Sequence, residues 1–189
     1  MLFLAIFAVI AASAIAEPET QSYSYSPPAG SGSGSPFSII GEGRITAVRV
    51  WESSSIRGIQ FRYGFTWSSV VGYMSGQLQE MELSDDEAII QISGKASHYV
   101  QSVVIVTSKG RHLEAGQPSG TSFNMYPSRK DAELVFISGT NHGAMTSIAA
   151  HWGRKALRLH FPGCFEARRR QQLCVLRFAR SKVMITRQT

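Results

Sequence analysis

The sequence predicts an all-β fold of the sandwich, barrel or prism type, and three observations carry that prediction. Short runs of β-branched and aromatic residues recur between residues 37 and 152, and turn-forming residues separate them at intervals of about 8–12 residues. One run, Ile59 to Tyr63, alternates apolar and polar side chains, which is typical of a half-buried strand. The same region has no stretch with the period of about 3.6 residues that marks an amphipathic helix.

Residues 1–16 are expected to be a signal peptide. Leu2 to Ala12 is an unbroken apolar run, shorter than the roughly 20 residues that a membrane span needs. Ala14 and Ala16 place small residues where signal peptidase cleaves. The alternative is an uncleaved N-terminal anchor. Cleavage after Ala16 predicts a secreted protein, which would then meet a membrane only peripherally.

Residues 17–29 are expected to form a flexible lead-in, because a Ser- and Pro-rich segment buries little apolar surface. The Gly- and Ser-rich stretch from Gly30 to Ser35 is either the end of this linker or a functional loop. Gly94 and Gly139 count among the expected turn residues. The clearest strand candidates are Ile45–Val50, Ile59–Tyr63, Ile89–Ile92, Val103–Val106 and Leu134–Ile137.

Part of this β-rich region repeats. The segment from Ile90 to Gly94 (IQISG) recurs as Val135 to Gly139 (VFISG), 45 residues later, and Val100–Val103 recurs as Met145–Ile148 at the same shift. A fainter copy, Ile45–Val48, resembles the segment at Val100. Repeated strand–loop–strand units indicate a symmetric all-β fold. Chance similarity between strands is the alternative.

The formal net charge of +6 is distributed unevenly. Residues 153–189 hold ten basic residues and one acidic residue, whereas residues 1–152 hold nine basic and twelve acidic ones. The positive net charge therefore comes from residues 153–189 and does not indicate a basic core that binds nucleic acid. The tail 153–189 is expected to be irregular. It is a membrane- or polyanion-binding extension, a processed segment, or a segment foreign to the natural protein. Cys164 and Cys174 within it would be able to pair in a secretory setting.

No enzyme signature is present in the sequence. The five histidines include no pair with the His-x-x-x-His spacing of a zinc site, and neither a Gly-x-Ser-x-Gly motif nor a phosphate-binding loop occurs. We therefore expect no catalysis, no metal and no cofactor. His151, beside Trp152, is expected to be a packed side chain at a strand end.

Several segments taken together resemble the jacalin-related lectins, most closely the zymogen granule protein 16 group of secreted animal members. The resemblance covers residues 30–152, which are expected to be one lectin domain. It implies a β-prism I fold of three four-stranded Greek-key sheets, which binds carbohydrate without metal and without catalysis. The segments that carry it are Gly43–Val50, Gly58–Gly64 with Trp67, Ile90–Lys95, Lys109–Arg111, Gly116–Asn124, Phe136–Gly139 and Ile148–Trp152.

The resemblance also implies ligands and a location. Family members of this group bind mannose-type glycans and glycosaminoglycans and are linked to secretory granules and mucosal secretions. The expected partners are therefore glycans, including those of mucus or granule-matrix glycoproteins, and not nucleic acid.

By the same resemblance, three loops should form the sugar site. The site is expected to combine a Gly-rich loop, a recognition loop and a binding loop. The alternative for the Gly-rich loop is the end of a linker, and the alternative for the recognition loop is a solvated hairpin tip. The expected residues are Gly32 and Gly34 in the first loop, Lys95, His98 and Tyr99 in the second, and His142, Gly143, Ala144, Met145 and Thr146 in the third.

The binding loop departs from the family pattern of Gly-x-x-x-Asp. The register set by His151 and Trp152 places His142 at the glycine and Thr146 at the aspartate. A shifted register places Gly143 at the glycine and Ser147 at the aspartate, and neither register gives a carboxylate. A carboxylate accepts stronger hydrogen bonds from sugar hydroxyls than a single threonine hydroxyl does. We therefore expect weak or altered sugar specificity. The alternatives are a lectin fold that has lost its sugar site and serves in granule or mucus packing, and a protein that binds sulfated polyanions through its arginines and lysines.

Overall fold

The computed structural model describes residues 23–154. The expected signal peptide, residues 17–22 of the lead-in, and the tail from Lys155 with its two cysteines lie outside this range. The described residues form thirteen strands and no helix, and hence no helix that would cross a membrane. The strands are β1 (Ser24–Gly30), β2 (Ser35–Ile39), β3 (Ile45–Glu52), β4 (Ile56–Tyr63), β5 (Thr66–Trp67), β6 (Val71–Gly72), β7 (Gln77–Glu82), β8 (Ile89–Ala96), β9 (Val100–Thr107), β10 (His112–Gly116), β11 (Thr121–Met125), β12 (Ala132–Asn141) and β13 (Met145–Arg154).

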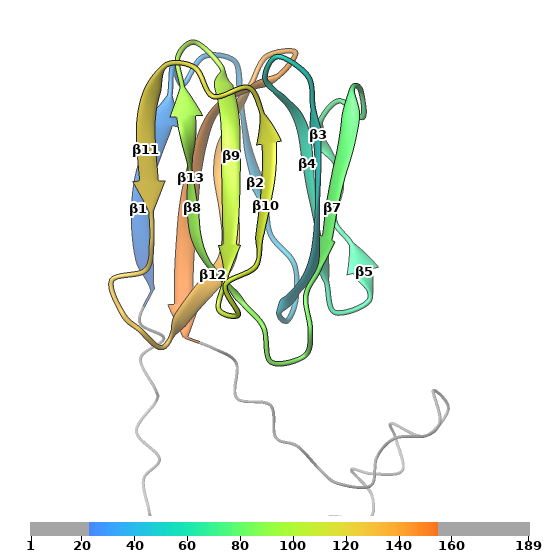
Figure 1. Cartoon of the computed structure of the whole chain (residues 1–189), viewed down its shortest axis with the longest axis vertical. Coiled ribbons are helices and arrows are strands. Elements are labelled where there is room, and N and C mark those ends of the chain that lie inside the picture. Colours follow the sequence, from blue (N-terminus) through green and yellow to red (C-terminus); the bar gives the residue numbers. More distant parts are fainter. Residues whose placement is uncertain (1–22, 155–189) are drawn as a thin grey trace, which may run out of the picture. The chain divides into compact units, whose positions relative to one another are not determined.

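The strands form three antiparallel sheets that face one another (Figure 1). Sheet A has the order β1-β13-β12-β2, sheet B the order β5-β4-β3-β7, and sheet C the order β10-β9-β8-β11. In sheet B the strand beside β4 is split in two, because β6 pairs with β4 as well. Each sheet has a central hairpin with one further strand on either side, which is a Greek-key arrangement. The expected prism of three four-stranded sheets is confirmed.

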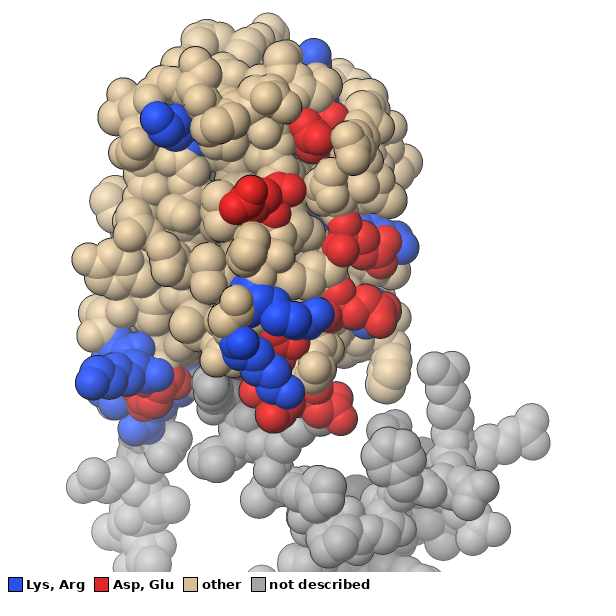
Figure 2. Space-filling view, in the orientation of Figure 1, with Lys and Arg blue, Asp and Glu red and all other residues tan. Residues whose placement is uncertain are grey.

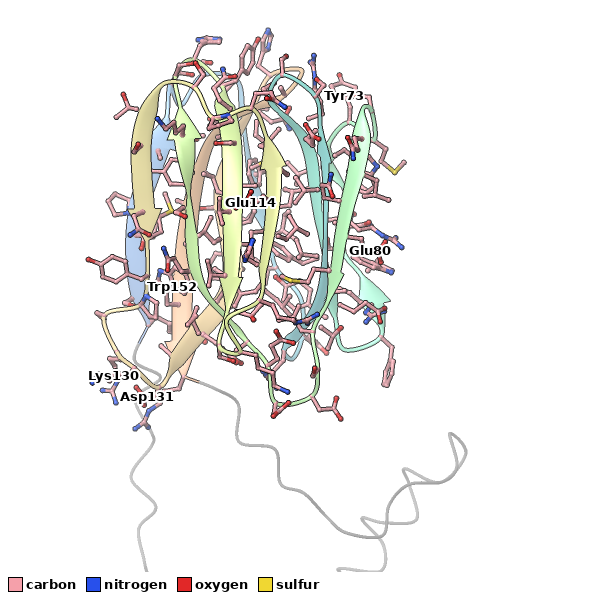
Figure 3. The ribbon with its side chains drawn as sticks, in the orientation of Figure 1. Tyr73, Glu80, Glu114, Lys130, Asp131 and Trp152 are labelled. Carbon is pink, nitrogen blue, oxygen red and sulfur yellow. The ribbon has the colours of Figure 1, made fainter. Side chains whose placement is uncertain are left out.

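The hydrophobic core lies between the sheets. All three central hairpins contribute fully buried side chains, including Phe61 from β4, Ile92 from β8 and Trp152 from β13. Figure 3 shows Trp152 between the sheets in the lower half of the view. Successive side chains of a strand point to opposite faces, which directs Phe61 and Ile92 inward, whereas β13 is buried at almost every residue.

The 45-residue repeat is a structural repeat. Gly94 pairs with Val103 in the β8–β9 hairpin, and Gly139 pairs with Ile148 at the same place in the β12–β13 hairpin. The prediction of a fainter third copy was wrong. Ile45–Val48 lies on β3, the first strand of its hairpin, whereas the segment at Val100 lies on β9, the second strand of its hairpin. The strand equivalent to β3 is therefore β8.

Gly94 and Gly139 are not turn residues, contrary to expectation. Both lie inside strands, where the neighbouring backbone comes very close. A Cβ added to Gly94 would lie 2.0 Å from the carbonyl oxygen of Ser102, and one added to Gly139 would lie 2.2 Å from that of Ser147. Glycine inside a strand often marks such a close approach.

Three loops of the form Gly-x-x-x-Gly lie on the three hairpins in the same way. Gly30 and Gly34 both have positive φ, and a Cβ on either would lie within 2.3 Å of a carbonyl oxygen of the β12–β13 hairpin. Only glycine adopts this conformation in this space without strain. The same contacts occur in sheet B at Gly72 and Gly76, and in sheet C at Gly116 and Gly120. The same contact between a Gly-x-x-x-Gly loop and a central hairpin therefore occurs in all three sheets.

The expected lead-in is in part a strand. Residues from Ser24 onward form β1, which pairs with β13 across a bulge between Ser26 and Ala29. Pro27 and Pro28 lie in this bulge, and proline is tolerated at the edge of a sheet because no ladder hydrogen bond is lost there. The hydroxyl of Ser26 also accepts a hydrogen bond of 2.9 Å from the indole nitrogen of Trp152. The folded unit thus begins before residue 30, and β13 carries it past residue 152 to Arg154.

Candidate functional site

The three expected loops come together at one end of the sheets. The connections β1–β2, β8–β9 and β12–β13 all lie at the upper end in Figure 1. The backbone nitrogen of Ser31 donates a hydrogen bond of 2.9 Å to the carbonyl oxygen of Thr146. The hydroxyl of the same serine donates one of 2.8 Å to the carbonyl oxygen of His98. One residue of the Gly-rich loop therefore links the other two loops.

The two glycines expected in the site have different surroundings. A Cβ on Gly34 would lie 2.3 Å from the carbonyl oxygen of Asn141 and 2.8 Å from the Cβ of His142. Gly34 thus fixes the Gly-rich loop against the β12–β13 turn. Gly32 has open space around it, with no atom within 4 Å of an added Cβ. Its backbone is exposed, so a ligand can approach it closely.

The β12–β13 turn presents only part of its expected residues to solvent. His142 and Gly143 are exposed, and the turn is closed by a 2.9 Å hydrogen bond from the nitrogen of His142 to the carbonyl oxygen of Ala144. Ala144 and Met145 are 1% and 0% exposed. Their side chains belong to the core, which leaves the backbone as the part of these two residues that is suited to binding a ligand.

Thr146 is fully buried, and its hydroxyl is used inside the protein. It donates a hydrogen bond to the carbonyl oxygen of Ser33. Because a hydroxyl carries one proton, the contact of 2.9 Å with the hydroxyl of Thr140 must then be donated by Thr140. That hydroxyl lies 2.8 Å from the Ser147 hydroxyl, which completes a chain of three side chains ending on the Gly-rich loop. The chain holds the loop in place without a ligand.

The β8–β9 loop adds an aromatic wall. The rings of His98 and Tyr99 meet edge to face with centroids 4.7 Å apart, and His98 is exposed while Tyr99 is half-buried. An aromatic ring of this kind can pack against the apolar face of a sugar. Lys95 lies farther back, on β8, in register with Ser102 and Ser122. It belongs to the face of sheet C rather than to the loop.

Most of the basic residues that would bind a polyanion are paired with carboxylates. Figure 2 shows Lys and Arg beside Asp and Glu in the lower part of the visible face. Residues 23–154 contain ten basic and ten acidic residues, so their net charge is zero. The structure therefore shows ion pairs where a free basic patch was the alternative. They are Arg44–Glu133 (3.1 Å), Arg49–Glu80 (2.9 Å), Arg62–Glu82 (2.9 Å), Lys109–Asp86 (2.6 Å) and Arg111–Glu87 (2.6 Å).

His151 is a packed side chain, as expected. Its ring stacks on Phe136 at a centroid distance of 3.9 Å and lies 4.9 Å from that of Tyr25. The nitrogen Nε2 is 2.8 Å from the hydroxyl of Ser138. Burial lowers the pKa of the imidazole, because it disfavours the charged form. Within residues 23–154, no three His, Cys, Asp or Glu side chains gather as a metal site would require.

Sequence reasoning missed the residues that organise the site. Ser31, Ser33, Thr140 and Ser147 carry the hydrogen bonds that join the loops. A signal was available in the repeat, since Thr140 directly follows the repeated segment Val135–Gly139 and Ser147 lies inside the repeated segment Met145–Ile148. Single residues in a Ser-rich stretch do not reveal their partners, which for Ser31 and Ser33 lie 67 and 113 residues away in the chain.

The fold and the clustered loops define a β-prism protein of the lectin type. The jacalin-like lectin domain model matches residues 26–151. The chain therefore belongs to the jacalin-like lectin family.

Curated relatives agree with this assignment. The chain is 45% identical to "Zymogen granule membrane protein 16" of both Rattus norvegicus and Homo sapiens over 112 residues, which is 59% of this chain and 67% of theirs. It is 35% identical to "Prostatic spermine-binding protein" of Rattus norvegicus over 107 residues, covering 54% of this chain and 38% of that protein.

Solved structures show the same architecture. A prostate-specific WGA16 glycoprotein lectin matches with a TM-score of 0.62 at 30% identity, over 70% of this chain and 100% of that one. Artocarpin, a lectin with mannose specificity, matches with a TM-score of 0.61 at 18% identity, over 68% of this chain and 95% of that one. The second likeness supports the fold alone.

Proposed function

We propose that the protein is a secreted, non-catalytic lectin that binds mannose-type glycans at the end of sheet A. The observation that carries this proposal is the junction of three loops through Ser31, whose nitrogen and hydroxyl bind the backbone carbonyls of Thr146 and His98. Several donors and acceptors held at one place on a rigid scaffold are what recognition of a polyhydroxylated ring needs. The net charge of zero over residues 23–154 fits a neutral ligand.

Recognition here would rely on backbone groups and hydroxyls rather than on a carboxylate. Thr146 holds the position where the family pattern has aspartate, and its hydroxyl is bound to Ser33. The exposed groups that remain are the backbone around Gly32 and Gly143 and the side chains of His98 and His142. Neutral hydrogen bonds are weaker than charge-assisted ones, so we propose low affinity or an altered preference among glycans.

The partners proposed are glycoproteins of secretory granules or mucus. The zymogen granule membrane protein 16 relatives support an association with granules. Secretion itself rests on the apolar N-terminal run and its small-residue cleavage site. Contact with a membrane would be peripheral in this case.

The second candidate is a lectin fold that has lost sugar binding and acts in granule or mucus packing. The buried hydroxyl of Thr146 favours it, because this residue offers no free acceptor. Binding of sulfated polyanions by the folded part is less well supported, because five of its basic residues already pair with carboxylates.

A glycan array with the full chain, read at about 0.05 and 0.5 M salt, tests the proposal. Binding to mannose-type glycans that persists at high salt and is competed by methyl α-mannoside supports the lectin. Binding to no glycan supports the packing protein. Binding only to sulfated glycans, lost at high salt, identifies a polyanion binder, because screening weakens such contacts.

A further inference from the structure

A pocket of about 280 Å³ opens between the end of β3 and the edge strand β10. Two carboxylates line it: Glu52 comes from β3, and Glu114 comes from β10. Figure 3 shows Glu114 midway along β10 on the face turned to the viewer. The remaining wall is largely apolar and includes Val104, Ala115 and Pro118. The pocket is thus acidic, with a wall suited to methylene groups.

Glu52 lines the pocket with a carboxylate that no group of residues 23–154 binds. It is 8% exposed, yet in residues 23–154 neither a hydrogen bond nor an ion pair reaches its carboxylate. The two nearest arginines in sequence are engaged elsewhere: Arg49 pairs with Glu80, and Arg57 donates to the hydroxyl of Ser53. No buried side-chain oxygen of residues 23–154 lacks a hydrogen-bond partner, so the oxygens of Glu52 are accessible from the pocket. A carboxylate in a mostly buried side chain is stabilised by a cation or by several donors. The pocket is where a compensating group would bind.

The fold does not require a carboxylate at this position. The glycines that end the three Gly-x-x-x-Gly loops contact the carbonyl oxygens of Glu52, Ala96 and Asn141, with Cβ distances of 2.1, 2.5 and 2.3 Å. These three residues are therefore equivalent in the three hairpins. Two of them carry no charge, and one is alanine. The charge of Glu52 is thus a feature of this pocket and not of the repeated architecture.

We propose that this pocket binds a primary alkylammonium group. The ammonium would donate to Glu52 inside the pocket and to Glu114 at its rim, while the adjoining methylene groups pack against the apolar wall. Charge-assisted hydrogen bonds of this kind are short and strong. Such a ligand offsets one of the two negative charges and donates to both carboxylates, whereas a neutral sugar offsets neither charge.

A divalent cation fits the pocket less well. Calcium takes about six to eight oxygen ligands, and two glutamates with a few backbone groups do not supply a charged cage of that size. His112 approaches Glu114 only to 3.7 Å and is exposed, so it does not occupy the acidic pocket. The alkylammonium could come from a free amine or from a lysine side chain of another protein, and both present the same group.

Nuclear magnetic resonance titration of the full chain with n-butylammonium chloride tests the proposal, with sodium chloride at equal ionic strength as the reference. Saturable shifts are expected at Val104, Ala115 and the residues beside Glu52. A second arm uses N-acetyl-lysine amide. Tighter binding of the lysine derivative points to a protein ligand, and tighter binding of butylammonium points to a free amine. Shifts that match those in sodium chloride, or that lie away from the pocket, overturn the proposal.

Variants separate this site from a structural role. Glu52→Gln should weaken butylammonium binding about tenfold or more, and should not lower the melting temperature of the free protein, because no group of residues 23–154 binds the carboxylate that it removes. Glu42→Gln, an exposed glutamate outside the pocket, is the matched control and should change neither value. Equal affinity in Glu52→Gln and the control overturns the proposal. If Glu52→Gln does not fold, Glu114→Gln takes its place. Weaker butylammonium binding by Glu114→Gln then supports the proposal, and unchanged binding overturns it. Affinity for methyl α-mannoside should be unchanged in every variant, which keeps this test separate from that of the lectin.

Discussion

The hydroxyl of Thr146 donates a hydrogen bond to the carbonyl oxygen of Ser33, 113 residues earlier in the chain. The bond joins the β12–β13 turn to the Gly-rich loop at the position that we assign to the aspartate of the family pattern. An aspartate carboxylate accepts hydrogen bonds but donates none when ionised. The shape of this site is therefore held by an internal bond that depends on threonine.

The first prediction concerns that bond. Thr146→Val keeps the β-branched shape but removes the hydroxyl, which leaves the Ser33 carbonyl without its donor. The free energy of unfolding should fall by about 1–3 kcal/mol, as for other buried polar groups that lose a partner. Urea unfolding measures the loss, and amide exchange should quicken in residues 31–33. Thr121→Val, an exposed position on edge strand β11, should cost less than about 0.5 kcal/mol. Equal losses in the two variants would contradict this role.

The second prediction concerns sugar affinity. Thr146→Asp should strengthen binding of methyl α-mannoside about tenfold or more, because an ionised carboxylate accepts stronger hydrogen bonds from sugar hydroxyls. The same change should lower the melting temperature of the sugar-free protein, since the carboxylate has no proton for Ser33. Calorimetric titration and thermal unfolding measure the two effects. Thr146→Asn, uncharged and of the same size, should gain less affinity. If the aspartate variant gains none, the register assigned to this loop is wrong.

The third prediction uses the repeated loops. Gly34 and Gly76 have φ of 96° and 94°, and a Cβ on each would lie 2.3 and 2.1 Å from a carbonyl oxygen. Gly34→Ala and Gly76→Ala should therefore destabilise the protein by similar amounts, about 1–3 kcal/mol. Only Gly34→Ala should also weaken glycan binding, because Gly34 contacts the β12–β13 turn of the proposed site, whereas Gly76 contacts Glu52 and Ser53 on the β3–β4 hairpin. Gly32→Ala has a positive φ but open space, so it should cost less. Equal loss of glycan binding in the Gly34 and Gly76 variants would place the glycan elsewhere.

The central strands could be predicted from sequence because their side chains carry the signal. Ile59, Phe61 and Tyr63 alternate with polar residues, and the strands that repeat after 45 residues have the same inward apolar positions. Strand β1 carried no such signal. It is an edge strand held by main-chain hydrogen bonds to β13 and by the Ser26–Trp152 bond, so a Ser- and Pro-rich composition hid it.

The site was predictable as a set of loops but not as a set of contacts. The family pattern places Gly34, His98 and His142 in three loops, and the fold brings those loops to one end. Which way the hydroxyl of Thr146 points depends on the close approach of Ser33, and local sequence does not encode a contact across 113 residues. The same holds for the arginines, whose carboxylate partners come from other strands.

At the other end of the sheets, a buried carboxylate makes the fold sensitive to acid. The side chain of Glu87 is 0% exposed and receives hydrogen bonds from Arg111 at 2.6 and 2.9 Å and from the Thr107 hydroxyl at 2.5 Å. The bond to Arg111 contributes most to lowering the pKa of Glu87 from 4.5 to about 2, and burial opposes it. Because the folded pKa lies below the unfolded one, the ionised group stabilises the fold above about pH 4.5, and this stabilisation is lost as the pH falls toward 2.

The last prediction follows from this linkage. Glu87→Gln should lower the free energy of unfolding by about 2 kcal/mol at pH 7, the size expected for hydrogen bonds to a charged group. The difference from the natural protein should shrink below pH 4.5 and vanish near pH 2, where Glu87 itself is becoming protonated. Urea unfolding across this pH range measures it. Glu80→Gln removes an exposed partner of Arg49 and should cost under about 1 kcal/mol. A difference for Glu87→Gln that stays constant down to pH 2 would show that shape, and not charge, makes Glu87 necessary.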